Sequence, residues 1–220
     1  MGLDIGLCSY GGNMSFDAMR KLPPEFRTSD ENRSGSHPGR YVAIDVDGTL
    51  ANVFPVIINR LNGEKGTSYT YEQYRHFGGA DLGMGWEEFH RRYVDAWTNH
   101  SSEIKPLVSE ERLLELTKHY GVFILTAMGD EVAGAFEAWL KKNFPVASGR
   151  VFIMRVEDQK HKLENGFTFL IDDCPALASA HIGHRVDLLV SQPYNRDVEI
   201  GPNTIRVRST DEAVQSLLRR

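Results

Sequence analysis

Two aspartates, Asp45 and Asp47, stand one residue apart at the end of an apolar stretch and are followed directly by Gly48 and Thr49. The run Tyr41–Leu50, which reads YVAIDVDGTL, predicts a buried strand that ends in a tight turn. Because side chains alternate along a strand, the two carboxylates start on the same side of the chain. Acids this close repel each other, and they need a cation, a shared proton or strong hydrogen-bond donors. A chemically idle acidic turn is the simpler alternative, and residues further along the chain argue against it.

Other residues suited to phosphate or metal chemistry stand at or near the ends of later predicted strands. They are Thr126, Lys160, Lys162, Asp172 and Asp173. Ligands of an open parallel sheet bind where its strands end, so we expect these residues on one rim together with the first two aspartates. Carboxylate oxygens and water suit Mg²⁺, whereas a hydroxyl, backbone N–H groups and an ammonium suit a phosphoryl group. The set predicts a Mg²⁺ site flanked by phosphate-binding groups.

The chain after residue 108 alternates regularly between predicted strands and predicted helices. Strands are expected over 122–125, 151–154, 167–171, 186–190 and 204–207, and helices over 110–120, 130–143, 175–181 and from a cap at Ser209 or Thr210 to Leu218. Repeated strand–helix units imply a parallel sheet that is covered on both faces. With the strand that begins at Tyr41, the chain is predicted to be an α/β protein with a Rossmann-like, doubly wound parallel sheet.

Residues 51–108 interrupt this alternation and are predicted to form a small all-helical insertion. Aromatic residues recur in it three or four positions apart, which places them on one face of a helix: Trp86, Phe89, Tyr93 and Trp97. At this spacing most of the aromatic stripe is expected to pack inside the insertion, and the rest to line a pocket. The predicted core therefore comprises residues 40–50 and 109–220.

The composition is that of a globular protein without a strong charge bias. Of its 220 residues 41% are hydrophobic, and 25 Lys and Arg stand against 30 Asp and Glu. Such a chain can bury a sizeable core, and without a basic run it is not expected to bind nucleic acid polymers or anionic membranes. No apolar run reaches the ~18 residues of a membrane span, and no signal peptide is recognisable. Cys8 and Cys174 stand far apart, so we expect a cytoplasmic protein, with residues 1–39 as a flexible leader.

Four short motifs taken together resemble those of the haloacid dehalogenase (HAD) superfamily of phosphohydrolases. They are DVDGT at Asp45–Thr49, FILTA at Phe123–Ala127, the single residue Lys162, and IDD at Ile171–Asp173. The first motif and the later acidic pair are specific as a set, although each piece alone is weak. The resemblance implies a HAD-like core, and it makes the insertion a C1-type cap that closes over the site and selects the leaving group.

The resemblance assigns the chemistry to the first two aspartates. Asp45 would be the nucleophile that attacks phosphorus and forms an aspartyl-phosphate. Asp47 would protonate the leaving oxygen and then activate water as a base, while its backbone carbonyl binds Mg²⁺. An acid at position 47 favours phosphate esters over carbon–halogen bonds. The cation would let an anionic nucleophile approach an anionic substrate.

The remaining motif residues would hold the phosphoryl group and the metal. In the resemblance, Thr126 and the backbone N–H of Ala127 bind phosphoryl oxygens, and Lys162 neutralises the phosphate and the nucleophile. Asp173 would be a direct Mg²⁺ ligand, and Asp172 would orient it or contact the lysine. The sequence leaves open whether Lys162 or Lys160 is the lysine that binds the phosphate.

Several details of the chain resemble the 5′(3′)-deoxyribonucleotidase group within the superfamily. The resemblance rests on the helical cap, the LTA segment, the lysine spacing, IDD and the segment Gln192–Asn195. A nucleoside monophosphate is therefore the expected substrate, because flat rings can stack on a base, and the candidates are Phe54, Phe77 and Trp86. The chain departs from the group in one respect, since the position of its base-stacking Phe holds Val53 here.

Three alternatives remain beside a nucleotidase. One is a phosphatase of sugar phosphates or another small phosphorylated metabolite, and another is a non-catalytic module that binds a phosphorylated ligand. The latter predicts decay of at least one motif, and none has decayed. A protein phosphatase is a third reading, but such enzymes usually lack a substantial cap, so the insertion at 51–108 argues against it. A homodimer is left open.

Overall fold

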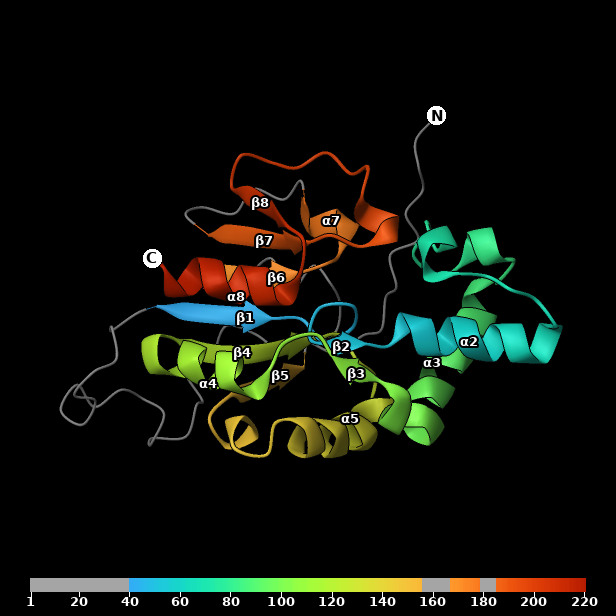
Figure 1. The fold of residues 1–220 in the computed structure, drawn as a ribbon, viewed down its shortest axis with the longest axis horizontal. Coiled ribbons are helices and arrows are strands. Elements are labelled where there is room, and N and C mark those ends of the chain that lie inside the picture. Colours follow the sequence, from blue (N-terminus) through green and yellow to red (C-terminus); the bar gives the residue numbers. More distant parts are fainter. Residues whose placement is uncertain (1–39, 156–166, 179–184) are drawn as a thin grey trace.

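The computed structural model describes residues 40–155, 167–178 and 185–220 of the chain (Figure 1). The expected leader, the end of the helix expected over 175–181, and both candidate lysines, Lys160 and Lys162, lie outside these residues.

A six-stranded parallel sheet forms the centre of the molecule, with strand order β5-β4-β1-β6-β7-β8. The strands are β1 (Tyr41–Ile44), β4 (Gly121–Thr126), β5 (Phe152–Arg155), β6 (Phe169–Asp172), β7 (Val186–Val190) and β8 (Thr204–Val207). The chain runs outward from β1 in both directions, so the order reverses at β1 and β6, which is where such sheets bind ligands. The predicted α/β fold with a doubly wound parallel sheet is confirmed.

The helices of the core are α4 (Glu110–His119), α5 (Asp130–Asn143), α7 (Pro175–Ala178) and α8 (Thr210–Leu218). Two of them begin at the serines that their sequence patterns favour as caps. The Ser109 hydroxyl accepts the N–H of Arg112 at 3.3 Å, and the Ser209 hydroxyl accepts the N–H of Glu212 at 3.1 Å. Each bond satisfies a backbone donor that the first turn of a helix leaves open, so these starts are set locally.

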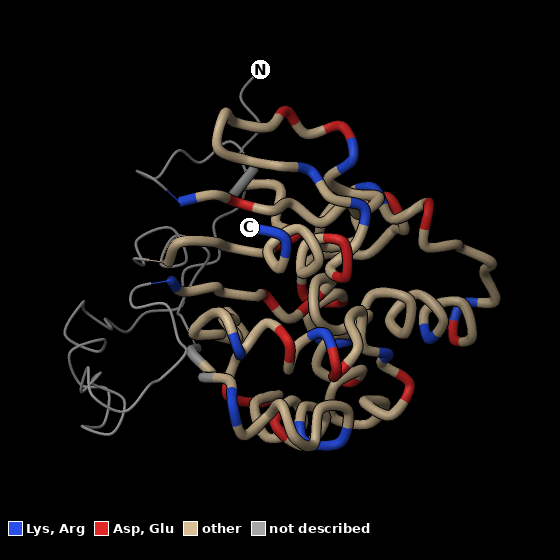
Figure 2. The backbone as a smooth tube through the Cα atoms, turned by 60° about the vertical axis from the view of Figure 1, so that its left-hand side comes forward, with Lys and Arg blue, Asp and Glu red and all other residues tan. Residues whose placement is uncertain are grey.

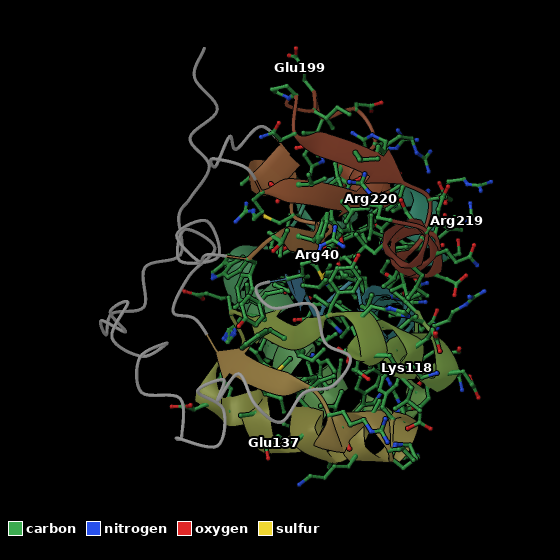
Figure 3. The ribbon with its side chains drawn as sticks, turned by 90° about the vertical axis from the view of Figure 1, so that its left-hand side faces the viewer. Arg40, Lys118, Glu137, Glu199, Arg219 and Arg220 are labelled. Atoms are coloured by element: carbon green, nitrogen blue, oxygen red, sulfur yellow. The ribbon has the colours of Figure 1, made fainter. Side chains whose placement is uncertain are left out.

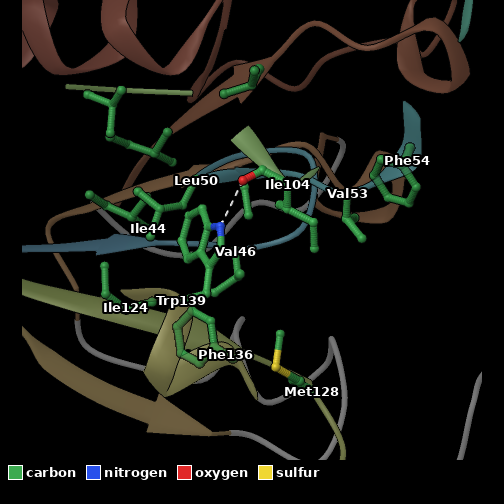
Figure 4. Close-up of a cluster of buried hydrophobic side chains, with 14 of the residues drawn as sticks. Ile44, Val46, Leu50, Val53, Phe54, Ile104, Ile124, Met128, Phe136 and Trp139 are labelled. Carbon is green, nitrogen blue, oxygen red and sulfur yellow. Dashed lines mark hydrogen bonds between the residues drawn. The ribbon is translucent and has the colours of Figure 1, made fainter. Parts of the chain in front are cut away.

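The central strand buries both of its faces, as its nearly continuous apolar run requires. Val42 and Ile44 join a large apolar cluster with residues of α4, α5 and α8, whereas Ala43 joins a smaller cluster on the other face. Figure 4 shows part of the large cluster, with Ile44 of β1 and with Phe136 and Trp139 of α5 among the residues drawn. This packing fixes the position and direction of β1, and therefore also the position of Asp45, which follows the strand.

The insertion begins and ends in a short antiparallel ribbon formed by β2 (Ala51–Asn52) and β3 (Lys105–Pro106). Between them lie α2 (Phe54–Lys65), α3 (Trp86–His100) and the one-turn helices η2 (Tyr71–Gln73), η3 (Ala80–Leu82) and η4 (Ser101–Glu103). The expectation of an all-helical insertion is therefore corrected at its ends, because strands of two residues are too short to produce a detectable alternation. In Figure 1 the strands of the core point toward this insertion.

Polar contacts attach the insertion to the core on two sides. On one side the Tyr71 hydroxyl donates to Oε1 of Gln192 at 2.7 Å. On the other side Nε2 of His90 lies 3.3 Å from Oε1 of Glu131, at the start of α5. The insertion thus spans the carboxyl end of the sheet instead of hanging from one edge.

The opposite end of the sheet carries two arginines that cover aromatic rings. The Arg40 guanidinium lies 5.6 Å from the ring centre of Tyr120, and that of Arg220 lies 5.7 Å from the ring centre of Phe169. Figure 3 shows both arginines at the end that faces the viewer. Elsewhere positive and negative residues are interspersed along the chain (Figure 2). Among the helices described, none is both long and apolar enough to serve as a membrane span.

Candidate functional site

The ends of β1 and β6 bring three aspartates together. Ile44 pairs with Ile171 in the parallel ladder, and the backbone N–H of Asp45 donates to the Ile171 carbonyl at 2.9 Å. Asp45 is therefore level with Asp172, and Asp173 follows directly. Each of these three aspartates is buried and offers a carboxylate oxygen within 4.8 Å of the other two.

Three negatively charged carboxylates at this separation repel one another. At an effective dielectric constant of about 20, two unit charges this far apart repel by roughly 3 kcal/mol. A divalent cation relieves that repulsion, and hard oxygen donors are the ligands that Mg²⁺ prefers. The residues present thus fit a Mg²⁺ ion in donor type, number and charge.

Side chains from two other segments fix the orientation of Asp173. The Thr49 hydroxyl donates to its Oδ1 at 3.2 Å, and the Tyr194 hydroxyl donates to its Oδ2. The Asn195 amide donates to its backbone carbonyl at 2.8 Å. Such outer contacts hold a metal-binding carboxylate in place. Asp172 is held in a similar way, because its Oδ1 accepts the backbone N–H of Cys174 at 2.8 Å.

Gly48 lies at a crowded position of the site. Its φ of +79° is in the left-handed region, which residues with a side chain seldom adopt. A Cβ at this position would lie 2.0 Å from Oδ2 of Asp173, 2.6 Å from the Tyr194 hydroxyl and 2.8 Å from Cε2 of Phe54. The absence of a side chain therefore allows the turn to pass directly over the Asp173 carboxylate.

The turn after Asp45 is closed by backbone hydrogen bonds. The N–H of Gly48 donates to the Ala51 carbonyl at 2.8 Å, and the N–H of Ala51 donates to the Val46 carbonyl at 2.8 Å. This turn carries Asp47 away from the sheet and toward the insertion. The two aspartates that start on one side of the strand in the sequence pattern therefore have different surroundings.

The Asp47 carboxylate is bound by two residues of α3. Its Oδ2 accepts the Tyr93 hydroxyl at 2.9 Å, and its Oδ1 accepts the indole N–H of Trp97 at 3.0 Å. Burial, and next the charge of Asp47, raise the pKa of the Tyr93 phenol well above its ordinary value. The hydroxyl therefore keeps its proton and acts as a donor to Asp47.

The predicted phosphate-binding residues lie at the end of β4 and directly after it. Thr126 is buried at the end of this strand, where its hydroxyl accepts the backbone N–H of Met128 at 3.2 Å, and Ala127 next to it is partly exposed. Since Ile44 pairs with Ile124, this turn leaves the sheet beside the one that carries Asp45. The predicted lysine, Lys162, lies outside the described residues.

The three candidate substrate-binding aromatics have different exposures. Phe54 is only 2% exposed, and its ring centre lies 5.2 Å from that of Tyr74 and 5.4 Å from that of Tyr194. Phe77 and Trp86 are 52% and 48% exposed. Free ring surface for a ligand is therefore offered by the last two, whereas Phe54 packs against other rings.

Sequence reasoning placed Tyr93 and Trp97 in a packing stripe and missed their contact with Asp47. A signal was present, because Tyr and Trp carry a polar group that needs a partner when the ring is buried. The stripe of Trp86, Phe89, Tyr93 and Trp97 puts two such groups on the buried face of one helix. Tyr194, which the sequence singles out only as part of the segment Gln192–Asn195, also donates its hydroxyl to Asp173.

Comparison with solved structures identifies the fold. The chain is similar to a candidate phosphoglycolate phosphatase from Lactobacillus plantarum, with 14% identity and a TM-score of 0.52 over 81% of this chain and 98% of that one. It is similar to CbbY from Rhodobacter sphaeroides, solved with phosphate, with 16% identity and a TM-score of 0.50 over 79% and 95%. It is also similar to a candidate haloacid dehalogenase-like hydrolase from Burkholderia xenovorans, with 16% identity and a TM-score of 0.52 over 83% of this chain and 100% of that one. No protein family model matches the sequence, and no curated protein matches it significantly. These similarities establish a HAD-like fold.

Proposed function

We propose that this protein is a Mg²⁺-dependent phosphomonoesterase that acts through an aspartyl-phosphate on a small phosphorylated metabolite. The observation that carries the proposal is the meeting of Asp45, Asp172 and Asp173 at the carboxyl end of the sheet, with Asp47 beside them under the insertion. The fold supports it, because the similar structures include phosphatases and one complex with phosphate.

Asp45 and Asp47 divide the reaction into two steps. In the first step an Asp45 oxygen bonds to phosphorus, the bond from phosphorus to the ester oxygen breaks, and Asp47 gives its proton to that oxygen. In the second step Asp47 takes a proton from water as the water oxygen attacks the aspartyl-phosphate. The bond to Asp45 then breaks, and inorganic phosphate leaves.

The other residues of the site compensate charge and orient the phosphoryl group. Asp45, Asp172, Asp173 and the backbone carbonyl of Asp47 would hold Mg²⁺, which supplies positive charge against the substrate phosphate and the developing transition state. The Thr126 hydroxyl and the next backbone N–H are the proposed donors to the phosphoryl oxygens. We propose Lys162 as the cationic partner of the phosphate.

A nucleoside monophosphate is the substrate class that we propose first. Phe77 and Trp86 support it, because their half-exposed rings belong to the insertion and offer flat surfaces for a base. A sugar phosphate or another small phosphorylated acid is the second candidate. It is favoured by the burial of Phe54 and by the similarity to a candidate phosphoglycolate phosphatase.

Replacement of the nucleophile tests the proposed chemistry. Asp45→Asn keeps the size of the side chain but removes its charge, and we expect kcat with any accepted phosphate ester to fall by about a thousandfold or more. Circular dichroism and thermal unfolding check that the fold persists. Turnover at the wild-type rate by this variant would refute the covalent mechanism. A wild-type protein that binds phosphate esters and turns none over would favour the non-catalytic binding module.

A substrate panel tests the proposed specificity. Deoxynucleotides, ribonucleotides, sugar phosphates and phosphoglycolate would be compared by kcat/KM, with Phe77→Ala and Trp86→Ala beside the wild type. If a base stacks on these rings, each variant loses about tenfold in kcat/KM for nucleotides and little for sugar phosphates, because one stacking contact contributes about 1–3 kcal/mol. No turnover of any nucleotide together with good turnover of a sugar phosphate would replace the first candidate with the second.

A further inference from the structure

The proposed acid of the reaction is held by the insertion and not by the catalytic core. Asp47 belongs to the turn after β1, yet two donors to its carboxylate come from one face of α3. The Tyr93 hydroxyl and the Trp97 indole N–H each bind a different oxygen, at 2.9 and 3.0 Å. Two bonds to two oxygens fix the plane of the carboxylate as well as its position.

Both groups act as donors to Asp47. An indole N–H has no acceptor capacity, and the Tyr93 hydroxyl lies 2.9 Å from a carboxylate oxygen, which has no hydrogen to give. The hydrogen of each bond therefore belongs to a residue of α3, and the Asp47 carboxylate is the acceptor in both.

The donors themselves are anchored to the core helix α5. Trp97 is completely buried, and its ring centre lies 5.8 Å from that of Phe136 and 5.7 Å from that of Trp139, both edge-on. The indole of Trp139 in turn donates to the Ile104 carbonyl at 2.9 Å, close to where the insertion ends (Figure 4). A completely buried ring that packs against two other rings has little freedom to rotate, so the indole N–H of Trp97 points in one fixed direction.

The rest of α3 is attached to the same helix. Tyr93 lies one turn before Trp97, and its ring contacts that of His90 with centres 6.5 Å apart. His90 reaches Glu131 at the start of α5, at 3.3 Å. Contacts at two levels therefore set the distance between α3 and the core.

We propose that Tyr93 and Trp97 are positioning residues, which aim the Asp47 carboxylate at the leaving oxygen of the substrate. This inference rests on the proposed function and adds to it. It makes the insertion part of the proton transfer, in addition to its role in choosing the substrate. Loss of either donor affects the steps in which Asp47 moves a proton, and leaves the attack by Asp45 intact.

Leaving groups of different basicity provide the test. An alkoxide leaves only when it is protonated, whereas 4-nitrophenolate leaves without help. Tyr93→Phe keeps the ring and removes the donor, so kcat/KM for an alkyl phosphate should fall by about 10–100-fold, part of the 10²–10⁴-fold that general acid catalysis supplies. For 4-nitrophenyl phosphate, kcat/KM should change less than about threefold, since kcat/KM reports only the first chemical step and this leaving group needs no proton. Trp97→Phe should give the same pattern.

Tyr120→Phe is the matched control. The Tyr120 hydroxyl is also buried and donates to one acceptor, the Leu217 carbonyl, at 3.0 Å on the far side of the core. Tyr120→Phe should lower the free energy of unfolding about as much as Tyr93→Phe does, and it should change kcat/KM equally for both esters. The positioning role is refuted if Tyr93→Phe lowers kcat/KM equally for both esters, lowers it for neither, or raises it for the alkyl phosphate.

A double-mutant cycle establishes that Tyr93 acts through Asp47. In the Asp47→Asn background, Tyr93→Phe should cause no further loss with the alkyl phosphate, because the group that it positions is gone. A further loss of the full single-mutant size would refute the inference. These outcomes differ from failure of the proposed function, in which the wild type hydrolyses neither ester or Asp45→Asn hydrolyses both at the normal rate.

Discussion

Gly48 offers the strictest test of how the site is built, because its neighbours allow both a steric and a chemical prediction. In Gly48→Ala the new methyl group would have to share space with Oδ2 of Asp173 at 2.0 Å and with the Tyr194 hydroxyl at 2.6 Å. Both distances are far below a normal van der Waals contact. The substitution must therefore move the turn, the carboxylate or the tyrosine.

The expected loss of stability has two parts. A non-glycine residue in the left-handed region costs roughly 1–2 kcal/mol. Insertion of a methyl group into a packed site costs typically about 1–3 kcal/mol more. The sum, about 2–5 kcal/mol, is a large part of the roughly 5–15 kcal/mol by which a domain is stable.

Gly66 provides a control for the first part alone. It ends α2 with a φ of +63°, and a Cβ placed on it meets no atom within 4 Å. Gly66→Ala should therefore cost only the roughly 1–2 kcal/mol of the left-handed backbone. The difference between the two variants isolates the crowding at Asp173.

Urea unfolding of the three proteins measures both losses, provided that the slope of free energy against urea is unchanged. We also expect kcat/KM of Gly48→Ala to fall by about tenfold or more, because the substitution displaces the proposed metal ligand Asp173. Gly66→Ala should retain wild-type activity. Equal destabilisation by the two substitutions would refute the argument that the turn passes over Asp173 because residue 48 has no side chain.

Three further predictions concern stability and metal binding. Arg185 and Asp187 form a buried ion pair with two hydrogen bonds, at 2.6 and 3.0 Å. Arg185→Met should therefore lower the free energy of unfolding, measured with urea, by about 3–5 kcal/mol, and the additional substitution Asp187→Leu should restore most of this loss. An equal loss in the double variant would contradict the prediction. Tyr194→Phe removes a donor to Asp173 and should weaken Mg²⁺ binding by about 10–100-fold in calorimetric titration, whereas unchanged affinity would show that this hydroxyl does not orient the carboxylate. Ser209→Ala removes the cap of α8 and should lower the free energy of unfolding by about 1 kcal/mol, and a change close to zero would mean that the cap is dispensable.

The elements of the core could be predicted from the sequence because their signals are local. Strands β7 and β8 and helix α5 match their expected ranges to the residue, since each is an apolar run or a periodic stripe between polar ends. The cap at Ser209 and the turn at Gly48 are equally local. The ribbon of β2 and β3 was not predicted, because its strands are two residues long and their partner is distant in the sequence.

The site was predictable where the topology alone brings residues together. Asp45, Asp172 and Asp173 meet because parallel strands end on one rim. The sequence indicates that Tyr93 and Trp97 need polar partners but not that the partner is Asp47, because that depends on where the turn directs the carboxylate and on how α3 docks on α5. Helical spacing indicates that Tyr93 and Trp97 share a face, and it carries no information about which polar group lies opposite them.

The β2–β3 ribbon has a consequence for how this molecule can change over evolutionary time. Because Asn52 and Lys105 are paired, the insertion leaves and rejoins the core at one place, and a different insertion could be exchanged there without breaking the sheet. Such an exchange would also remove the two side chains of α3 that hold Asp47. A newly acquired insertion must therefore supply its own donors for this aspartate before it can offer a new specificity, which narrows the set of insertions that descendants of this chain can adopt.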